Sequence, residues 1–189
     1  MVDWTRVKWS EAAQVIEQLD WADDPGDAAR GPPERYFEGL RQARRLEDAV
    51  FFLGMALPRH ETVAWAARSV RDISEGHERP RADSDALKAA LLWVQDPSEP
   101  RRRAAFDAAQ LADTGSSERL TAMAVFFSGG SLTPENVQPL PAANDVAGRI
   151  AAGAILVAAG LRPDRIAAIN RALDEGDAIA RWGLNGPRT

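Results

Sequence analysis

The chain has 189 residues, of which 45% are apolar and 27% charged, a composition that fits one folded domain and argues against wholesale disorder. Its 28 acidic and 23 basic residues give a net charge of −5, which disfavours sequence-independent nucleic-acid binding because such proteins carry a basic excess. The chain has no cysteine, so disulfides, thiolate metal sites and thiol chemistry are excluded.

The amino terminus, Met1 to Trp4, lacks the basic and apolar regions of a signal peptide. The longest nearly apolar stretch, residues 150–161, is shorter than the roughly 20 residues that a transmembrane helix needs. We interpret this stretch as a buried core helix. We therefore expect no membrane insertion and a cytoplasmic location.

Apolar residues recur at helical spacing along most of the chain, and capping residues or prolines separate the stretches. Ser10 is the expected N-cap of the first helix, and Pro33 fits the first turn of the second. The third helix carries a wide apolar face, so we expect it to be central. In chain order, the predicted helices span residues 10–19, 33–44, 46–57, 58–73, 85–95, 99–113, 116–127, 144–159 and 163–182.

Particular residues mark the expected ends of the later helices. Ser84 is the expected N-cap of the fifth helix, and Gly160 fits the position just after the eighth. Gly176 is an expected weak point of the ninth helix. A linker at 128–143 carries three prolines and separates the seventh helix from the eighth.

Alanine-rich apolar content without sustained period-2 alternation predicts an all-α fold, a single irregular helical domain of about eight to nine short helices. We assign this domain to residues 1–183. It includes an N-terminal helix and loop at 1–32 and the linker at 128–143, and a flexible tail follows at 184–189. A helical-hairpin or repeat arrangement is the alternative, although no internal period is found.

No motif for catalysis, cofactor binding or metal binding is recognisable. His60-Glu61 begins like the zinc motif HExxH, but Ala64 stands where the second histidine is required, so we interpret His60 as a surface or capping residue. The acidic residues at 83–85 are interpreted as helix capping rather than as a Ca²⁺ loop. The glycine-rich run 128–131 follows a predicted helix rather than a strand, which indicates a helix stop with positive φ rather than a phosphate loop.

Two groups of arginines are candidates for an interaction surface. One group lies in the first turn of the predicted sixth helix, where cations face the positive end of the helix dipole. The simpler interpretation of that group is a salt-bridged face with long stems over the core, and the sharper one is a site for an acidic partner. The two groups are Arg101, Arg102 and Arg103, and Arg41, Arg44, Arg45 and Arg59.

The six tryptophans form a second candidate set. Trp65 and Trp93 lie within predicted helices and are expected in the core. Trp4, Trp9 and Trp21 flank the first helix, where a small element offers few ways to bury them. Exposed tryptophans are typical of protein interfaces, whereas core use is the more common role, and both interpretations stay open for these three.

Three segments carry distinctive residue strings. Residues 51–66 read FFLGMALPRHETVAWA, similar to the pattern FLAxxLPRREAVWWA, and residues 93–105 contain WVQDPSE and then RRAA. Residues 127–134 read FSGGSLTP, similar to FSGGSLAP. On these strings the chain resembles the bacterial family of unknown function DUF6931 over roughly residues 35–182. In this chain His60 replaces the second arginine of the pattern, and Ala64 replaces its first tryptophan.

The resemblance implies a bacterial accessory or adaptor protein associated with gene neighbourhoods of type VI secretion systems, and it brings no catalytic residue. Together with the arginines and tryptophans, it predicts a non-enzymatic protein whose partner is another protein, such as a secretion-system component or effector. The alternative is an enzyme with a dispersed site of carboxylates and arginines that only folding brings together. A homodimer is left open, and nucleic-acid binding is disfavoured by a pI of about 5.1.

Overall fold

The computed structural model describes residues 3–21, 26–134 and 136–186. This part of the chain is a single all-α domain, as the sequence predicts, with one isolated β-bridge between Ser131 and Pro141. Its elements are α1 Ala12–Ile16, the 3₁₀ turn η1 Asp27–Arg30, α2 Pro33–Gln42, α3 Leu46–Ala56, α4 Arg59–Ile73, α5 Arg81–Gln95, α6 Glu99–Leu111, α7 Ser117–Phe127, α8 Val146–Gly160 and α9 Arg165–Trp182.

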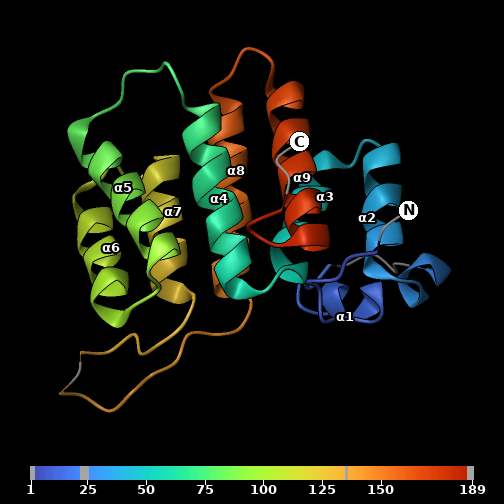
Figure 1. Ribbon diagram of the computed structural model, residues 1–189, viewed down its shortest axis with the longest axis horizontal. Helices are drawn as coiled ribbons and strands as arrows, with labels where there is room; N and C mark the ends of the chain where they lie inside the picture. Colours follow the sequence, from blue (N-terminus) through green and yellow to red (C-terminus); the bar gives the residue numbers. More distant parts are fainter. Residues whose placement is uncertain (1–2, 22–25, 135, 187–189) are drawn as a thin grey trace.

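Helices α4 and α8 lie side by side at the centre of the domain (Figure 1). Helices α5, α6 and α7 pack on one side of this pair, and α2, α3 and α9 pack on the other. Helix α8 contacts α3, α4, α7 and α9. Its sequence is apolar almost all round, which suits a helix that is covered on several sides. The predicted core helix at 150–161 is therefore confirmed up to Ala159, whereas Gly160 is exposed and Leu161 lies beyond α8 with 72% of its surface exposed.

Small residues let α3 and α8 approach each other closely. A Cβ atom on Gly148 would lie 2.6 Å from the Met55 sulfur and 2.8 Å from the carbonyl oxygen of Gly54. Only a residue without a side chain fits such an approach of two backbones. Around this crossing, Phe52, Leu53 and Ile155 are fully buried and fill the core.

Two predicted helix starts are wrong. The first helix begins at Ala12 rather than Ser10, because Glu11 and Gln14 form a capping box. Helix α5 begins at Arg81 rather than Asp85, with Pro80 at the N-cap, so Ser84 lies exposed within the helix. The turn η1 was not predicted within the loop at 20–32, part of which lies outside the described residues.

The C-terminal predictions also need correction. Gly160 is the last residue of α8 rather than the residue after it. Helix α9 runs through Gly176, as predicted. At this position the helix packs against Trp65 and leaves no room for a side chain. The predicted tail falls partly outside the described residues. In its described part, Leu184 packs against the core, and its carbonyl oxygen accepts a hydrogen bond from Arg68 at 3.1 Å.

Among the described residues, every helix is either too short or too polar to traverse a bilayer.

Candidate functional site

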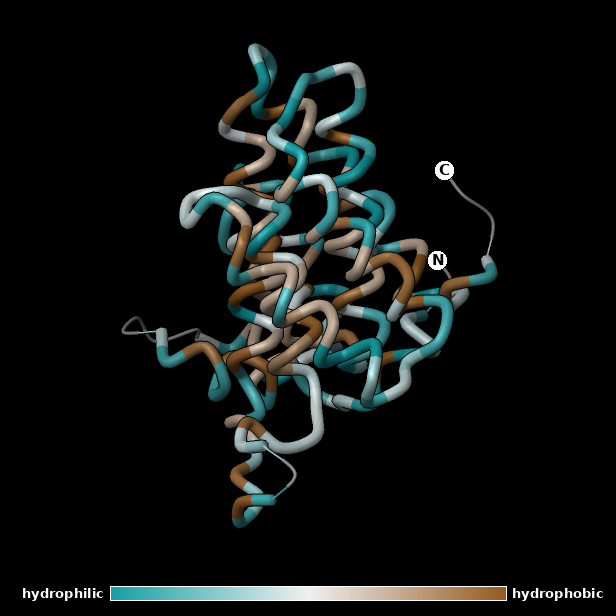
Figure 2. Tube along the Cα trace, turned by 90° about the vertical axis from the view of Figure 1, so that its left-hand side faces the viewer, coloured by the Kyte–Doolittle hydropathy of each residue, from teal (hydrophilic) through white to brown (hydrophobic). Residues whose placement is uncertain are grey.

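The segment between α7 and α8 leaves the helical domain and returns to it, forming a projection at the lower edge of the molecule (Figures 1 and 2). We call residues 129–144 the arm. Near its base the two sides of the arm meet, where the Leu132 amide donates to the Leu140 carbonyl at 2.8 Å. The side chains of Val137 and of Leu140 itself expose 48% and 56% of their surface. The arm therefore presents apolar side chains to solvent.

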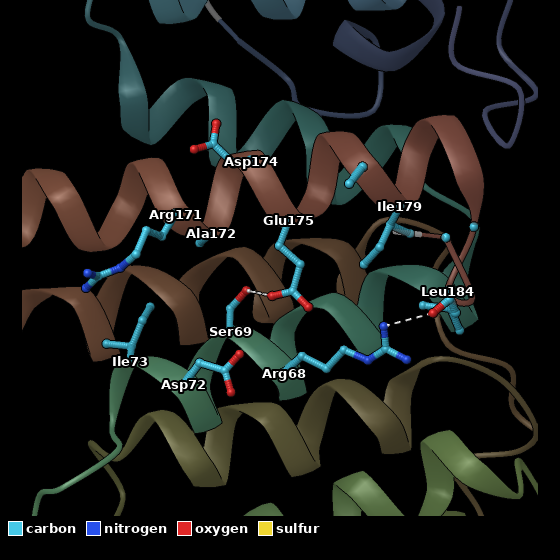
Figure 3. A pocket seen from close by; sticks show the side chains of 13 residues that line it. Arg68, Ser69, Asp72, Ile73, Arg171, Ala172, Asp174, Glu175, Ile179 and Leu184 are labelled. Atoms are coloured by element: carbon cyan, nitrogen blue, oxygen red, sulfur yellow. Dashed lines mark hydrogen bonds between the residues drawn. The ribbon is translucent and has the colours of Figure 1, made fainter. Parts of the chain in front are cut away.

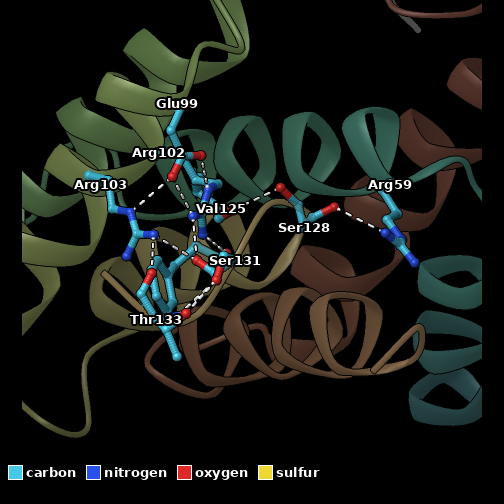
Figure 4. A network of polar contacts seen from close by, with 9 residues as sticks. Arg59, Glu99, Arg102, Arg103, Val125, Ser128, Ser131 and Thr133 are labelled. Carbon is cyan, nitrogen blue, oxygen red and sulfur yellow. Dashed lines mark hydrogen bonds and ion pairs between the residues drawn. The ribbon is translucent and has the colours of Figure 1, made fainter. Parts of the chain in front are cut away.

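Two arginines of α6 hold the base of the arm (Figure 4). Arg102 donates to the carbonyl oxygens of Phe126 at 2.6 Å and Ser131 at 2.7 Å. Arg103 donates to the carbonyls of Ser131 at 2.8 Å and Thr133 at 2.7 Å. Glu99 accepts from both arginines, at 2.6 Å from Arg102 Nε and 2.9 Å from Arg103 Nε. We call Glu99, Arg102 and Arg103 the arginine clamp.

The clamp also depends on a glycine at the start of the arm. Gly130 has φ 65°, in the left-handed region, as the predicted helix stop requires. A Cβ atom at this position would lie 2.9 Å from Arg102 Nε and 2.9 Å from Glu99 Oε2. The clamp thus packs directly against the Gly130 backbone, in a place where any side chain would collide with it.

Electrostatics fix the ionised state of the clamp. The pKa of Glu99 lies below its ordinary value of 4.5, chiefly because Arg102 donates a hydrogen bond to the carboxylate, with Arg103 adding to the effect. A carboxylate held in this way stays charged at neutral pH. It serves to orient the two arginines rather than to donate a proton.

Two pockets lie on either side of Arg59, at the beginning of α4. The Trp9 pocket has a volume of about 320 Å³, and the Trp93 pocket has a volume of about 300 Å³. The Trp9 pocket is lined by Lys8, Trp9, Gln18, Gly54, Met55, Leu57, Pro58, Arg59, Thr62, Asn144 and Gly148. The Trp93 pocket is lined by Arg59, His60, Trp93, Pro97, Ser98, Glu99, Arg102, Ser128, Gly129 and Gly130. We call the two together the Arg59 site.

Neutral groups position Arg59 between these pockets. Its guanidinium donates to the Ser128 carbonyl oxygen at 3.5 Å and to Oδ1 of Asn144, which closes the arm at its other end. The side chain is exposed and points away from the arginine clamp (Figure 4). Arg59 therefore connects the residue just before the arm to the last residue of the arm, and it still faces solvent.

His60 does not lie on the open surface, contrary to the sequence-based interpretation. It is half-buried, its Nε2 lies 3.0 Å from the Val94 carbonyl oxygen, and its ring meets Trp93 edge-on with centroids 5.4 Å apart. Both contacts come from the last turn of α5, which packs against the start of α4. The sequence alone does not show this contact.

The structure separates the arginines that the sequence groups together. Arg101 is partly exposed and pairs with Asp96 at 2.7 Å, whereas Arg102 is only 3% exposed and Arg103 reaches the arm. Arg102 is therefore excluded from a contact surface, because α6 turns its side chain under the arm. All three arginines form ion pairs, as the simpler interpretation expects, but only Arg101 and Arg103 keep exposed surface.

The second arginine group does not form one surface either. Arg41 pairs with Asp174 of α9 at 2.7 Å, and Arg45 pairs with Asp48 at 2.6 Å. Arg44 is exposed just after α2 with φ 59°. Arg59 pairs with neither Asp174 nor Asp48. Of the four arginines, it is the one that lines the Trp9 and Trp93 pockets.

The three N-terminal tryptophans have different environments. Trp4 belongs to the core: it is 6% exposed, and its Nε1 donates to Asp177 at 2.7 Å. Trp21 is half-buried and packs against the core, with the Arg45 guanidinium 5.9 Å from its ring. Trp9 is half-buried and lines its pocket, with Lys8 Nζ 4.7 Å from its ring. Trp9 thus remains accessible to a partner protein, whereas Trp4 is buried in the core and cannot form an interface.

A larger pocket of about 410 Å³ lies between α4 and α9 (Figure 3). Its charged lining residues are Arg68, Asp72, Arg171, Asp174 and Glu175. Glu175 accepts from Ser69 at 3.3 Å, while Asp72 and Asp174 bind arginines at 2.7 Å. In the described ranges, no group of three histidines or acids is arranged to hold a metal ion.

The three strings that distinguish the sequence meet at the Arg59 site. Residues 51–66 supply Arg59 and His60, residues 93–105 supply Trp93 and the clamp, and residues 127–134 supply the base of the arm. Lys8 and Asn144 also line the site. The sequence did not mark Lys8, and it marked Asn144 only as the start of the eighth helix. Only their placement by the fold relates them to Arg59.

The chain was compared with known families and proteins. The sequence profile of DUF6931, described as a family of unknown function, matches residues 36–180. No curated protein matches the chain, and no solved structure does.

Proposed function

This chain belongs to the DUF6931 family, and from that premise and the geometry of the Arg59 site we propose that it is a non-enzymatic adaptor or accessory protein. It binds another protein through the face formed by the Arg59 site and the arm. The residues at that face recognise a partner protein and do not carry out a chemical step.

One observation carries the proposal. The three strings that mark the family pattern are distant in the sequence, yet they meet where two arginines anchor a projecting arm. The arm exposes Val137 and Leu140, and its 16 residues include one charged residue, Glu135, in a chain that is 27% charged overall. A positioned segment with exposed apolar side chains and little charge is typical of a protein contact.

The partner that we propose first is a component or effector of a type VI secretion system. This choice comes from the gene neighbourhoods that we associate with the family. It places the adaptor in the bacterial cytoplasm.

The test is affinity co-purification of the tagged full-length protein from its native host, with crosslinking and mass spectrometry. We expect a secretion-system protein to be enriched above a mock control. The double variant Val137→Ser, Leu140→Ser should lose it, because it removes the exposed apolar contacts of the arm without touching the core.

The matched control is Leu161→Ser, Ile166→Ser. These residues are 72% and 62% exposed, and they lie by the α8–α9 connection, at the opposite end of the molecule from the arm. This variant should retain the partner. Recovery of no companion by the wild-type protein after crosslinking, or equal loss in both double variants, would contradict the proposal.

A second candidate function rests on the pocket between α4 and α9. It brings together Asp174, Glu175 and Arg68, the residue types that a dispersed enzyme site would need. Asp72 and Asp174 have half-exposed side chains, 53% and 49%, and each already binds an arginine, which fits a binding role better than proton transfer. A metabolite screen by thermal shift, repeated with Glu175→Gln, tests this candidate.

A further inference from the structure

We propose that the Arg59 site binds an extended acidic segment of the partner protein. In this segment one carboxylate pairs with Arg59, and an apolar side chain on each side enters one of the two pockets. The inference rests on the proposed function and names the chemistry of the partner.

The Arg59 site carries positive charge that no acidic side chain of the Trp9 pocket balances. Lys8 and Arg59 both line the Trp9 pocket, and no acidic residue lines it. In the part of the chain that the structure describes, the ion pairs include neither of these two residues. Ser128 and Asn144 orient the Arg59 guanidinium through neutral oxygens, so they hold it in place without neutralising its charge. An oriented guanidinium is suited to pair with a carboxylate.

The Trp93 pocket contains an acid, but that acid is already bound. Glu99 accepts from Arg102 at 2.7 Å and from Arg103 at 2.9 Å. Its negative charge is therefore matched within the clamp and does not compete for Arg59. The positive charge at the shared edge of the two pockets remains for a ligand.

Apolar side chains line the pockets on both sides of Arg59. Trp9, Met55 and Leu57 contribute apolar atoms to one pocket. Trp93 and Pro97 contribute to the other, where the His60 ring packs edge-on against Trp93. A site with an apolar lining and a few directed polar groups favours a ligand of the same pattern.

Arg59 lines both the Trp9 pocket and the Trp93 pocket. Because both pockets include this residue, a ligand that fills both must pass over it. In an extended chain, side chains two residues apart point to the same face, about 6.6–6.8 Å apart. An apolar–x–acidic–x–apolar segment thus presents its carboxylate at the centre and an apolar side chain on either side. A free chain terminus at Arg59 would leave one pocket unfilled.

The experiment uses the full-length protein labelled with ¹⁵N and observes the indole signals of Trp9 and Trp93, one in each pocket. The probe is a synthetic peptide with blocked ends and the sequence Gly-Ser-Leu-Ser-Glu-Ser-Leu-Ser-Gly. We expect saturable shifts of both signals, which Trp9→Phe and Trp93→Phe assign. Binding should weaken at least tenfold when glutamine replaces the peptide glutamate, and it should weaken in high salt.

Variants of the protein make the test specific. Arg59→Glu should weaken binding at least tenfold, Arg59→Lys should retain part of it, and Lys88→Glu, an exposed cation of α5, should leave it unchanged. Arg59→Gln removes the charge if the reversal proves unstable, with circular dichroism as the check of folding. Equal binding of the glutamine peptide, no shift at millimolar peptide, or preference for a peptide ending in a free leucine carboxylate would overturn the inference.

The two proposals fail in different ways. If the host partner is still captured by Arg59→Glu but lost with the Val137→Ser, Leu140→Ser variant, the adaptor role stands and the acidic segment is wrong. If the peptide binds as expected but no partner is recovered from the host, the recognition chemistry stands and the adaptor role is wrong.

Discussion

Arg102 donates a 2.7 Å hydrogen bond from Nη2 to the carbonyl oxygen of Ser131, a residue 29 positions away in the sequence. Through its other terminal nitrogen the same guanidinium reaches the carbonyl of Phe126 at 2.6 Å. One side chain of α6 thus joins the last turn of α7 to the first residues of the arm. The stability of the domain and the position of the arm are therefore coupled at this residue.

The first prediction concerns the difference between neighbouring arginines. Arg102→Ala should lower the free energy of unfolding by about 3 kcal/mol. This is the lower end of the cost of removing one partner from a buried ion pair. We expect the lower end because Glu99 still pairs with Arg103 in the variant. Arg101→Ala should lower it by at most about 1 kcal/mol, because its pair with Asp96 is exposed. Urea unfolding followed by circular dichroism measures both, and equal effects would refute the assigned burial.

The second prediction concerns the glycines at the base of the arm. Gly130→Ala should loosen the arm, because position 130 has φ 65° and its Cβ would lie 2.9 Å from the Arg102 guanidinium. Gly129→Ala should have little effect, since nothing lies within 4 Å of its Cβ position. Amide hydrogen exchange at Leu132, which donates to Leu140, should accelerate in the first variant only.

The third prediction concerns pH. The pKa of Glu99 is lowered in the folded protein, mainly by Arg102, so its carboxylate contributes stability that is fully present above the unfolded value of about 4.5. That contribution is lost as the pH falls from about 4.5 through the lower folded pKa. Glu99→Gln should therefore lose less stability than the wild-type protein between pH 5 and pH 3, as compared by urea midpoints. Parallel losses in the two proteins would refute the coupling.

The fourth prediction concerns the packing of α9. Gly176→Ala should destabilise the protein by about 1–3 kcal/mol, as overpacking does in a core. Its Cβ would collide with Leu53 Cδ2 and would lie 2.8 Å from Trp65 Nε1, which itself donates to the Ala172 carbonyl. Gly153→Ala, with nothing within 4 Å, should instead stabilise α8 by about 0.5–1 kcal/mol. Thermal unfolding should separate the two variants in sign.

The fifth prediction concerns the N-terminal tryptophans. Trp4→Ala should cost about 3–5 kcal/mol, because it removes a core ring that packs on Phe37 at 5.1 Å between centroids. Trp9→Ala should cost clearly less, since Trp9 is half-buried. The same unfolding assay applies, and a Trp9 variant as unstable as the Trp4 variant would indicate that Trp9 is structural.

Much of the fold could be predicted from local patterns. The helical periodicity placed α3, α4, α6 and α7 within two residues of their observed ends, because a buried helix face repeats along the sequence. The N-caps of α1 and α5 were assigned wrongly. There, Ser10 and Ser84 are good capping residues, but Glu11 and Pro80 occupy the caps. Several residues near a terminus can serve as a cap, so local preference alone does not select one.

The candidate site was harder to predict than the helices. The sequence marked Arg59, Trp9 and the run 128–131, but it grouped Arg59 with Arg41, Arg44 and Arg45, which are near in the sequence only. It left Lys8 unmarked and placed Asn144 only at the start of the predicted eighth helix, because single polar residues carry no periodic signal. Their role depends on the loops that the fold brings to the start of α4.

By itself the sequence determined the helical class, the absence of thiol chemistry and the strings that identify the family, since these depend on composition and local order. Only the tertiary structure decided that Arg102 lies beneath the arm while Arg101 faces solvent. Adjacent residues of a helix point in directions about 100° apart, so which of them is buried depends on the segment that packs against that face. That segment, from Phe126 to Thr133, comes from a distant part of the chain.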